Sequence, residues 1–396
     1  MNIVCISASQ VPSEAANSIQ VMKACQALAQ LGHRVRLLVP EPAGKKHPAH
    51  PNTQQLAAFY GLQTTFPVDW LPAERYLKKY DFCMSAARQA RAYSADLVYT
   101  WPLQAAVFAA RHEVPIVLEM HGPPEGKLGP LLFSLLLWLP ENKRILPITG
   151  ALTRMLGDYS LDWRNALNQH PESGLHTVSI KPNLSFTISP NGVDLERFHG
   201  LPVPAQARAE LGLPEGFTAG YTGHLYPGRG MGLLVELAGR FPQVNFLWVG
   251  GKPEDVSNWR TKLQAENLSN VTLTGFVDNS RLPTYQVAAE VLLMPYERTI
   301  AGSSGGNSAT YASPMKMFEY MACRRTILSS DLPVIREVLN ESNAMLLPPE
   351  DPDAWASALQ DCLDDPIKSQ QLAKQAWQDV QQYTWLERAR RALEGF

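Results

Sequence analysis

One stretch late in the chain decides the fold, and it reads Ser313-Pro314-Met315-Lys316-Met317-Phe318-Glu319-Tyr320-Met321-Ala322-Cys323. It follows a strand-like apolar run, residues 291–296, and precedes a second one, residues 326–331. Its own apolar residues recur at helical spacing, which predicts a short helix packed against a sheet. A strand, a loop and a short helix in this order place a ligand site at the carboxyl edge of a parallel sheet.

Glu319 is the acidic residue of this predicted helix, and it lies beside the apolar face. An unpaired carboxylate is costly to bury at such a position. Two interpretations stay open from the helix alone: a carboxylate that binds a ligand, or a capping or salt-bridged surface residue. Short motifs match by chance too often to decide between them.

Length and composition indicate a globular protein of two domains, because 396 residues exceed one ordinary core. The formal net charge is −2, so nothing points to nucleic acid as a partner. The five cysteines are scattered without C-x-x-C spacing, so we expect neither a metal site nor a disulfide framework. They fit a reducing cytoplasm. Residues 1–7 predict a first strand rather than a signal peptide.

An apolar run at residues 128–139 is shorter than the roughly 18–20 residues that span a bilayer. A buried core helix is the first interpretation. The second is an interfacial helix, because Lys143 and Arg144 follow the run and suit contact with a membrane surface. We therefore expect a cytoplasmic protein, with peripheral contact at the inner membrane face as the alternative.

Strand and helix signals alternate along the chain, which predicts parallel sheets with helices on both faces. A Pro and an Asn-Gly turn within residues 185–198 mark a linker between two such halves. A cleft between the halves is the natural ligand site. The predicted strands span residues 3–8, 35–39, 96–101, 115–120, 145–149, 218–222, 244–249, 271–276, 291–296, 326–330 and 344–347.

A glycine-rich loop at residues 223–232 follows a strand and opens a helix. Glycine lets the backbone approach a ligand closely, and a helix N-terminus suits phosphate. Arg229 adds a fork that can grip two phosphate oxygens. The spacing matches neither G-x-G-x-x-G nor a P-loop, so it does not indicate a nicotinamide or ATP site. A plain tight turn with an exposed Arg is the alternative.

His121 lies on a Gly/Pro loop at the end of a predicted strand of the first half. This position suits hydrogen bonding to a substrate hydroxyl or proton handling near neutral pH. The alternative is a histidine that only satisfies local hydrogen bonds. A polar loop at residues 301–308 predicts either a mobile lid or a connector.

Taken in order, these motifs resemble glycosyltransferase family 4, a family of retaining enzymes with the GT-B fold. The resemblance implies an α/β chain of two Rossmann-like domains facing across a cleft. Residues 1–186 would form the acceptor domain and residues 187–375 the donor-nucleotide domain, with a C-terminal helix at about 376–396 crossing back. The resemblance rests on residues 13–38, 119–124, 148–152, 188–194, 221–232, 275–277 and 313–331.

The family resemblance also implies a nucleoside-diphosphate sugar as donor, with a UDP-sugar as the first expectation and no cofactor. Glu319 matches the second Glu of the family's Glu-x7-Glu motif, which binds the ribose hydroxyls. Arg229 stands where the family usually has a Lys on the diphosphate, and His224 where it often has an Arg. His121 matches the histidine near the transferred sugar. The implied catalytic residues are thus His121, Arg229 and Glu319, and the further donor contacts are Gly223, His224, Phe276, Val277, Met315 and Lys316.

The implied reaction is metal-independent transfer of a hexose to a hydroxyl acceptor, with retention of the anomeric configuration, in carbohydrate biosynthesis. The acceptor is left open among glycans, lipids and small metabolites. The sequence departs from the family at Tyr311, which replaces the first Glu, and at Pro314, which removes an N–H donor. A non-catalytic sugar-nucleotide-binding protein and a sugar-nucleotide epimerase on the same fold therefore stay as alternatives.

Overall fold

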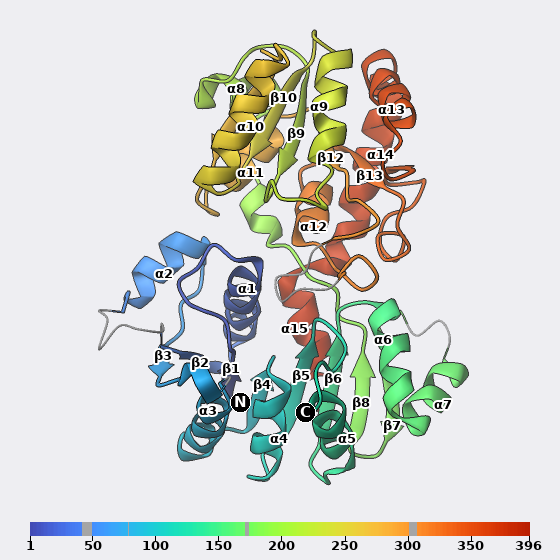
Figure 1. Ribbon diagram of the computed structural model, residues 1–396. Coiled ribbons are helices and arrows are strands. Elements are labelled where there is room, and N and C mark those ends of the chain that lie inside the picture. Colours follow the sequence, from blue (N-terminus) through green and yellow to red (C-terminus); the bar gives the residue numbers. More distant parts are fainter. Residues whose placement is uncertain (42–49, 78, 171–173, 301–306) are drawn as a thin grey trace. The chain divides into compact units, whose positions relative to one another are not determined.

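The computed structural model describes residues 1–41, 50–77, 79–170, 174–300 and 307–396. It comprises two compact units, labelled by element in Figure 1. Unit 1 consists of Met1–Asn191 and Trp385–Phe396, and unit 2 is Gly192–Thr384. The predicted lid or connector at residues 301–308 lies mostly outside the described residues.

The chain passes between the units after Asn191 and again after Thr384. The first crossing comes later than the predicted boundary at residue 186, because the Ser189 N–H donates to the Pro147 carbonyl at 2.8 Å and so keeps this segment in unit 1. The returning segment starts at Trp385 rather than near residue 376, since the preceding helix packs on the sheet of unit 2.

Unit 1 holds an eight-stranded sheet in the order β3-β2-β1-β4-β5-β6-β8-β7. The strand pairs are parallel except that β7 runs antiparallel to β8. The central strands are buried along nearly their whole length, as expected for a parallel sheet covered on both faces. The strands are β1 (Asn2–Ile6), β2 (Arg34–Pro40), β3 (Val68–Leu71), β4 (Leu97–Thr100), β5 (Ile116–Met120), β6 (Lys143–Pro147), β7 (Thr177–Lys181) and β8 (Leu184–Thr187).

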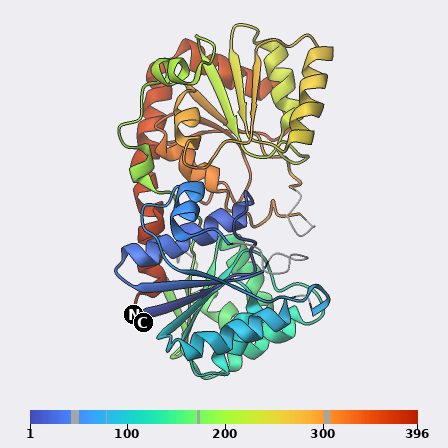
Figure 2. The same cartoon turned by 90° about the vertical axis from the view of Figure 1, so that its left-hand side faces the viewer.

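The helices of unit 1 include one from the far end of the chain. Helix α15, drawn in red, packs against α1, and both chain termini lie in this unit (Figures 1 and 2). The helices are α1 (Ala16–Gln30), α2 (Thr53–Tyr60), η1 (Arg75–Leu77), α3 (Tyr80–Ala92), α4 (Leu103–Ala110), α5 (Gly129–Trp138), α6 (Gly150–Leu156), η2 (Gly157–Tyr159), α7 (Leu161–Gln169) and α15 (Trp385–Leu393).

Helix α5 carries the apolar run of the sequence, and one of its faces is buried while Leu131 and Trp138 are exposed. The expectation that Lys143 and Arg144 suit a membrane surface is wrong, because both are buried in β6. The Lys143 ammonium donates to the carbonyl oxygens of Leu139 and Glu141 at 2.5 and 2.7 Å. The Arg144 guanidinium donates likewise to the carbonyl oxygens of Arg391 and Ala392. Within the described ranges, no helix is both long and apolar enough to cross a membrane.

Unit 2 holds six parallel strands in the order β11-β10-β9-β12-β13-β14. Counted from the first strand of each unit, both sheets contain the order 3-2-1-4-5-6 of a Rossmann sheet. In unit 2 the order reverses between β9 and β12, and ligands bind outside the carboxyl ends of strands at such a point. The strands are β9 (Thr218–Thr222), β10 (Asn245–Val249), β11 (Val271–Gly275), β12 (Val291–Met294), β13 (Thr326–Ser330) and β14 (Met345–Leu347).

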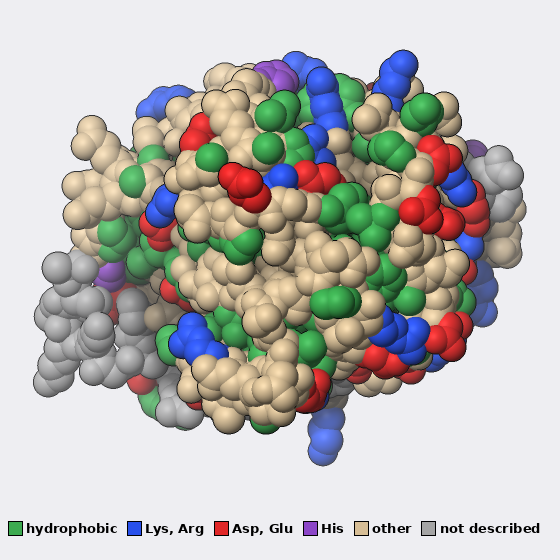
Figure 3. Space-filling model, turned by 90° about the horizontal axis from the view of Figure 1, so that it is seen from above, with side chains coloured by type: hydrophobic (Ala, Val, Ile, Leu, Met, Phe, Trp, Pro, Cys, Tyr) green, Lys and Arg blue, Asp and Glu red, His purple; other side chains and the backbone are tan. Residues whose placement is uncertain are grey.

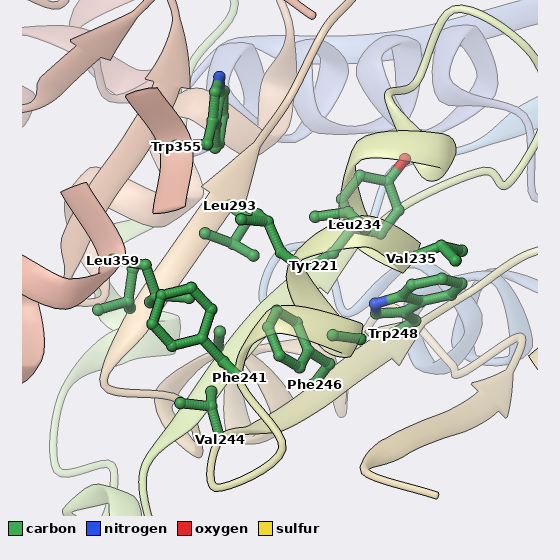
Figure 4. Close-up of a cluster of buried hydrophobic side chains, with 14 of the residues drawn as sticks. Tyr221, Leu234, Val235, Phe241, Val244, Phe246, Trp248, Leu293, Trp355 and Leu359 are labelled. Atoms are coloured by element: carbon green, nitrogen blue, oxygen red, sulfur yellow. The ribbon is translucent and has the colours of Figure 1, made fainter. Parts of the chain in front are cut away.

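The helices of unit 2 pack around a core of large apolar side chains (Figure 4). Tyr221, Trp248 and Trp355 belong to this cluster. Tyr221 is therefore packed into the core near the carboxyl end of β9. The helices are η3 (Leu195–Phe198), α8 (Pro204–Leu211), α9 (Met231–Arg240), α10 (Pro253–Ala265), α11 (Leu282–Val287), α12 (Met315–Ala322), α13 (Pro352–Asp364), α14 (Pro366–Asp379) and η4 (Val380–Tyr383).

Acidic and basic side chains are interspersed on the face of the molecule shown in Figure 3. That face carries no broad patch of one sign, in keeping with the formal net charge of −2. The five cysteines are all buried and free.

Candidate functional site

The site in unit 2 begins where β9 ends, at a close approach of two backbones. The Gly223 N–H donates to the Val249 carbonyl at 2.8 Å, and a Cβ on Gly250 would lie 2.5 Å from the Gly223 oxygen. Gly223 has a φ of 135°, and a Cβ there would lie 2.9 Å from the Lys316 Nζ. Only glycine fits at these positions. The predicted glycine loop and the decisive helix therefore meet at this edge of the sheet.

Two basic side chains, Arg229 and Lys316, lie over tyrosine rings at this edge of the sheet. The Lys316 Nζ lies 4.0 Å from the ring centroid of Tyr221 and 5.3 Å from that of Tyr296. The Arg229 Cζ lies 4.9 Å from the ring centroid of Tyr226 and 5.1 Å from that of Tyr296. We call Arg229 and Lys316 the cation pair, and Tyr221, Tyr226 and Tyr296 the tyrosine cluster.

No carboxylate forms a direct ion pair with the cation pair in the part of the chain that the structure describes. Arg229 donates to the Tyr226 hydroxyl at 2.5 Å, and no carboxylate forms an ion pair with either side chain. Burial lowers the pKa of Lys316 well below its usual value, and the charge of Arg229 lowers it further, while the charge of the nearby Glu319 opposes this shift. Two neighbouring basic side chains without a direct ion-pair partner among the described residues form an electrostatic site prepared for an anion.

His224 lies next to the cation pair, and its ring stacks on Tyr226 with centroids 5.2 Å apart. Burial lowers the pKa of His224, and the charges of Arg229 and Lys316 lower it further. The imidazole is therefore neutral at neutral pH, so it can form a hydrogen bond to an anion but adds no charge. Its backbone carbonyl accepts a hydrogen bond from the Tyr221 hydroxyl at 2.5 Å, which fixes the loop to the core.

Glu319 lies one turn after Lys316 on α12, so both side chains share one side of the helix. Its Oε2 accepts a hydrogen bond from the buried Gln286 at 2.9 Å. Its Oε1 has no hydrogen-bond partner among the described residues and is available to a ligand hydroxyl. The helix is anchored because the Thr222 N–H donates to the Tyr320 hydroxyl at 2.8 Å.

The remaining predicted donor contacts lie at two places. Met315 opens α12 directly before Lys316. Phe276 and Val277 follow β11, two strands away from β9 in the sheet, and the Phe276 side chain is 43% exposed. Among the described residues, no hydrogen bond, ion pair or ring contact joins Phe276 or Val277 to the cation pair. The structure thus unites Gly223, His224, Arg229, Met315, Lys316 and Glu319. Phe276 and Val277 follow Gly275, whose carbonyl accepts from the N–H of Gly250 beside Gly223.

His121 belongs to unit 1 and has a buried carboxylate as its partner. Its Nε2 lies 2.6 Å from Oε1 of Glu119, and its side chain is 36% exposed. Burial alone would raise the pKa of Glu119, but the Arg388 charge and the hydrogen bond from His121 outweigh it and lower the pKa to about 2. The Glu119 carboxylate is therefore ionised at neutral pH and accepts the imidazole N–H.

Sequence reasoning missed the tyrosine cluster, Gln286 and Arg388. Tyr221 and Tyr296 count as ordinary apolar residues of strand-like runs, and Tyr226 as part of a loop. No sequence motif marked Gln286, because this residue of α11 contacts Glu319 of α12 only in the folded chain. Within the described ranges, no group of three or more His, Cys, Asp or Glu side chains is placed to hold a metal ion.

Comparison of the chain with models of known protein families identifies its family. The family model described as Glycosyl transferases group 1 matches residues 216–365, and the one described as Glycosyltransferase Family 4 matches residues 18–165. The chain belongs to glycosyltransferase family 4. It is therefore a glycosyltransferase enzyme, as the sequence predicts.

Two curated relatives are similar over different parts of this glycosyltransferase. The phosphatidyl-myo-inositol mannosyltransferase of Mycolicibacterium smegmatis is 26% identical over 92% of this chain and 85% of that protein. The putative teichuronic acid biosynthesis glycosyltransferase TuaH of Bacillus subtilis is 31% identical over 36% of this chain. That second match spans only 34% of the length of TuaH.

Solved structures confirm the predicted GT-B class. Anabaena HepE in complex with UDP is 16% identical, with a TM-score of 0.68 over 100% of this chain and 99% of that one. Sucrose-phosphate synthase of Thermosynechococcus elongatus is 21% identical, with a TM-score of 0.66 over 98% of this chain and 96% of that one. At these identities the likeness concerns the fold alone.

Proposed function

We propose that this glycosyltransferase moves a hexose from a UDP-sugar to a hydroxyl acceptor, with retention of configuration and without a metal ion. One observation carries the proposal: the cation pair lies at the carboxyl edge of the sheet in unit 2, without a direct ion-pair partner among the described residues. Negative charge grows on the diphosphate as the glycosidic bond breaks, and donors already in place stabilise that charge at no cost of reorganisation.

Each residue of this edge has a proposed role. The Arg229 guanidinium binds two phosphate oxygens in its fork, and the Lys316 ammonium acts as a point charge. His224 supplies a neutral hydrogen bond, and Gly223 leaves room for the phosphates. A divalent cation commonly neutralises transferred phosphates. In our proposal Arg229 and Lys316 supply the two positive charges instead, so no metal is required.

The nucleoside is proposed to lie along α12 and the end of β11. The open Oε1 of Glu319 accepts a ribose hydroxyl, while Gln286 holds the other oxygen in place. The exposed ring of Phe276 and the backbone at Val277 contact the base. UDP is the first choice, because solved structures of HepE hold UDP and UDP-glucose.

The acceptor is proposed to carry a hydroxyl group. The names of relatives include an inositol-lipid mannosyltransferase, a D-inositol 3-phosphate glycosyltransferase and a galactosylglucosyldiacylglycerol synthase. His121 is proposed to contact the transferred sugar. The free cysteines fit a reaction in the cytoplasm, with membrane contact left as an open part of the proposal.

Donor turnover tests this proposal. The protein is incubated with UDP-hexoses and a panel of polyol, inositol-lipid and sugar acceptors in EDTA, and proton NMR reads the anomeric configuration of the product. We expect acceptor-dependent product with the configuration of the donor, undiminished by EDTA. Loss of turnover in EDTA with rescue by Mn²⁺ would refute the metal-independent mechanism.

Two other results would replace the proposal. Nucleotide binding without donor consumption would favour a sugar-nucleotide-binding protein, for which Tyr311 and Pro314 are the supporting departures. Epimerised free donor without acceptor-dependent product would favour an epimerase.

A further inference from the structure

The carboxylate of Glu119 is the centre of a buried network in unit 1. Its Oε1 accepts hydrogen bonds from His121 at 2.6 Å, from Arg388 at 2.7 Å, and from the Gln20 amide. Its Oε2 accepts from the Tyr99 hydroxyl at 2.7 Å, and that hydroxyl accepts from Arg388 Nη1 at 3.1 Å. The Glu119 side chain is completely buried and the Arg388 side chain is 2% exposed.

Arg388 reaches this network from α15, the helix at the far end of the chain. Its Nε donates to the Pro190 carbonyl at 2.9 Å, and its Nη2 donates to the Ser189 carbonyl at 3.2 Å. These carbonyls lie just before the first crossing between the units, and α15 starts just after the second. One guanidinium therefore ties both crossing points to the carboxylate that holds His121.

The charges around Glu119 depend on Arg388. Burial opposes ionisation of Glu119, and Arg388 is the main group that overcomes it. Burial likewise opposes the charge of Arg388, whose pKa is raised because Glu119 and Tyr99 outweigh that effect. Burial raises the pKa of Tyr99 and of Cys25 on α1, so both stay neutral. His121 is a further titratable group in contact with this carboxylate.

We propose that Arg388 is a positioning residue for His121. Arg388 keeps Glu119 ionised, and the carboxylate then accepts the Nε2–H of the imidazole. This fixes the ring and its tautomer and leaves Nδ1, which has no partner among the described residues, as an acceptor for a substrate hydroxyl. The inference rests on the proposed function only in the part that gives His121 a substrate contact.

Without the charge of Arg388, the buried Glu119 takes up a proton at a higher pH. The resulting carboxylic acid donates its O–H to Nε2 of His121, and the ring proton moves to Nδ1. A merely structural ion pair would dock α15 without controlling this tautomer, so the tautomer distinguishes the two roles.

Nitrogen NMR of the full chain labelled with 15N-histidine measures the tautomer, with a His121→Gln variant to assign the signal. We expect the Nε2–H form in the wild type and the Nδ1–H form in Arg388→Met at neutral pH. Arg388→Gln removes the charge but keeps donors for the two carbonyls, so it serves if the Met variant does not fold. Arg390→Met, an exposed change on the same helix, is the control and should leave the signal unchanged.

The pH profile of kcat/KM is the second measurement. We expect the Met or Gln variant to gain an acid limb above about pH 5 that the wild type lacks, and to lose about tenfold to a hundredfold in kcat at neutral pH. An unchanged Nε2–H tautomer in a folded charge-free variant would overturn the proposal. The NMR result needs no substrate. A tautomer change in the variants together with a wild type that shows no transfer would therefore support the role of Arg388 and refute the proposed function.

Discussion

Replacing Arg229 by alanine removes one member of the cation pair and tests how the site holds its donor. The guanidinium has no acidic partner among the described residues, so its loss leaves no buried carboxylate unpaired and the fold should persist. Removing one preorganised donor to a developing oxyanion costs about 2–4 kcal/mol of transition-state stabilisation, or roughly thirtyfold to a thousandfold in kcat/KM.

The neighbouring Lys316 should offset part of that loss. The Arg229 charge contributes to lowering the pKa of Lys316, so its removal raises that pKa and makes the ammonium a better ligand. The contribution of Lys316 is then larger in the Arg229→Ala background than in the wild type. We therefore expect Arg229→Ala combined with Lys316→Met to cost more than the sum of the single changes.

Proton uptake on UDP binding measures how far the pKa of Lys316 rises when the diphosphate binds. The free protein holds Lys316 with a lowered pKa, and a bound diphosphate raises it again. UDP binding should therefore take up protons, and affinity should fall as pH rises between the free and the bound pKa of Lys316. Calorimetry in two buffers of different ionisation enthalpy measures the uptake, which should be smaller in Arg229→Ala.

The kinetic assay is kcat/KM with the UDP-hexose found to be turned over, and the control is Arg240→Ala. Arg240 is an exposed arginine of the same unit that pairs with Glu236 and Asp353, so this variant should match the wild type. A wild-type kcat/KM in folded Arg229→Ala would refute the assignment of the cation pair to the diphosphate.

Three further predictions follow from single contacts. Gln286→Leu leaves Oε2 of Glu319 without its donor and should weaken UDP binding by about 1 kcal/mol in a titration, whereas unchanged affinity would exclude a holding role. Gly230→Ala puts a Cβ 1.9 Å from the Pro295 carbonyl oxygen and should lower the unfolding free energy by about 2–4 kcal/mol, while Gly232→Ala in open space should not destabilise the protein in the same urea titration. The Glu119 pKa of about 2 lies below its value in the unfolded chain, so the ionised carboxylate stabilises the fold above about pH 4.3. This stabilisation is lost as pH falls toward 2. The unfolding free energy of a Glu119→Gln variant, measured against pH, should lack this decrease.

Much of the fold could be predicted because buried parallel strands read as continuous apolar runs. The predicted strands at 218–222 and 326–330 have the observed bounds, and the helix around Glu319 forms as its apolar spacing indicates. The prediction for Lys143 and Arg144 was wrong for a physical reason. Both follow an apolar helix in sequence, but β6 carries them into the interior, where backbone carbonyls accept hydrogen bonds from them.

Sequence alone could group the residues of the candidate site that lie close together along the chain. Arg229 and His224 share one loop, and Lys316 and Glu319 share one helix. The tyrosine cluster could not be predicted, because Tyr221 and Tyr296 come from the ends of two strands that only the sheet order makes neighbours. Arg388 is separated from Glu119 by most of the chain, and no local pattern marks such a pair.

The most direct test of the central claim is the thermal stability of the protein with UDP, GDP, ADP, dTDP and CMP in EDTA, for the wild type and for Lys316→Met. Lys262→Met is the matched control, because Lys262 also lies over an aromatic ring, 5.1 Å from the centroid of Trp259, but is exposed. UDP at a hundred times its Kd should add about 2.7 kcal/mol to wild type and control, and the gain should largely vanish in Lys316→Met. An equal gain in all three proteins, or no gain from any nucleotide, would contradict the account.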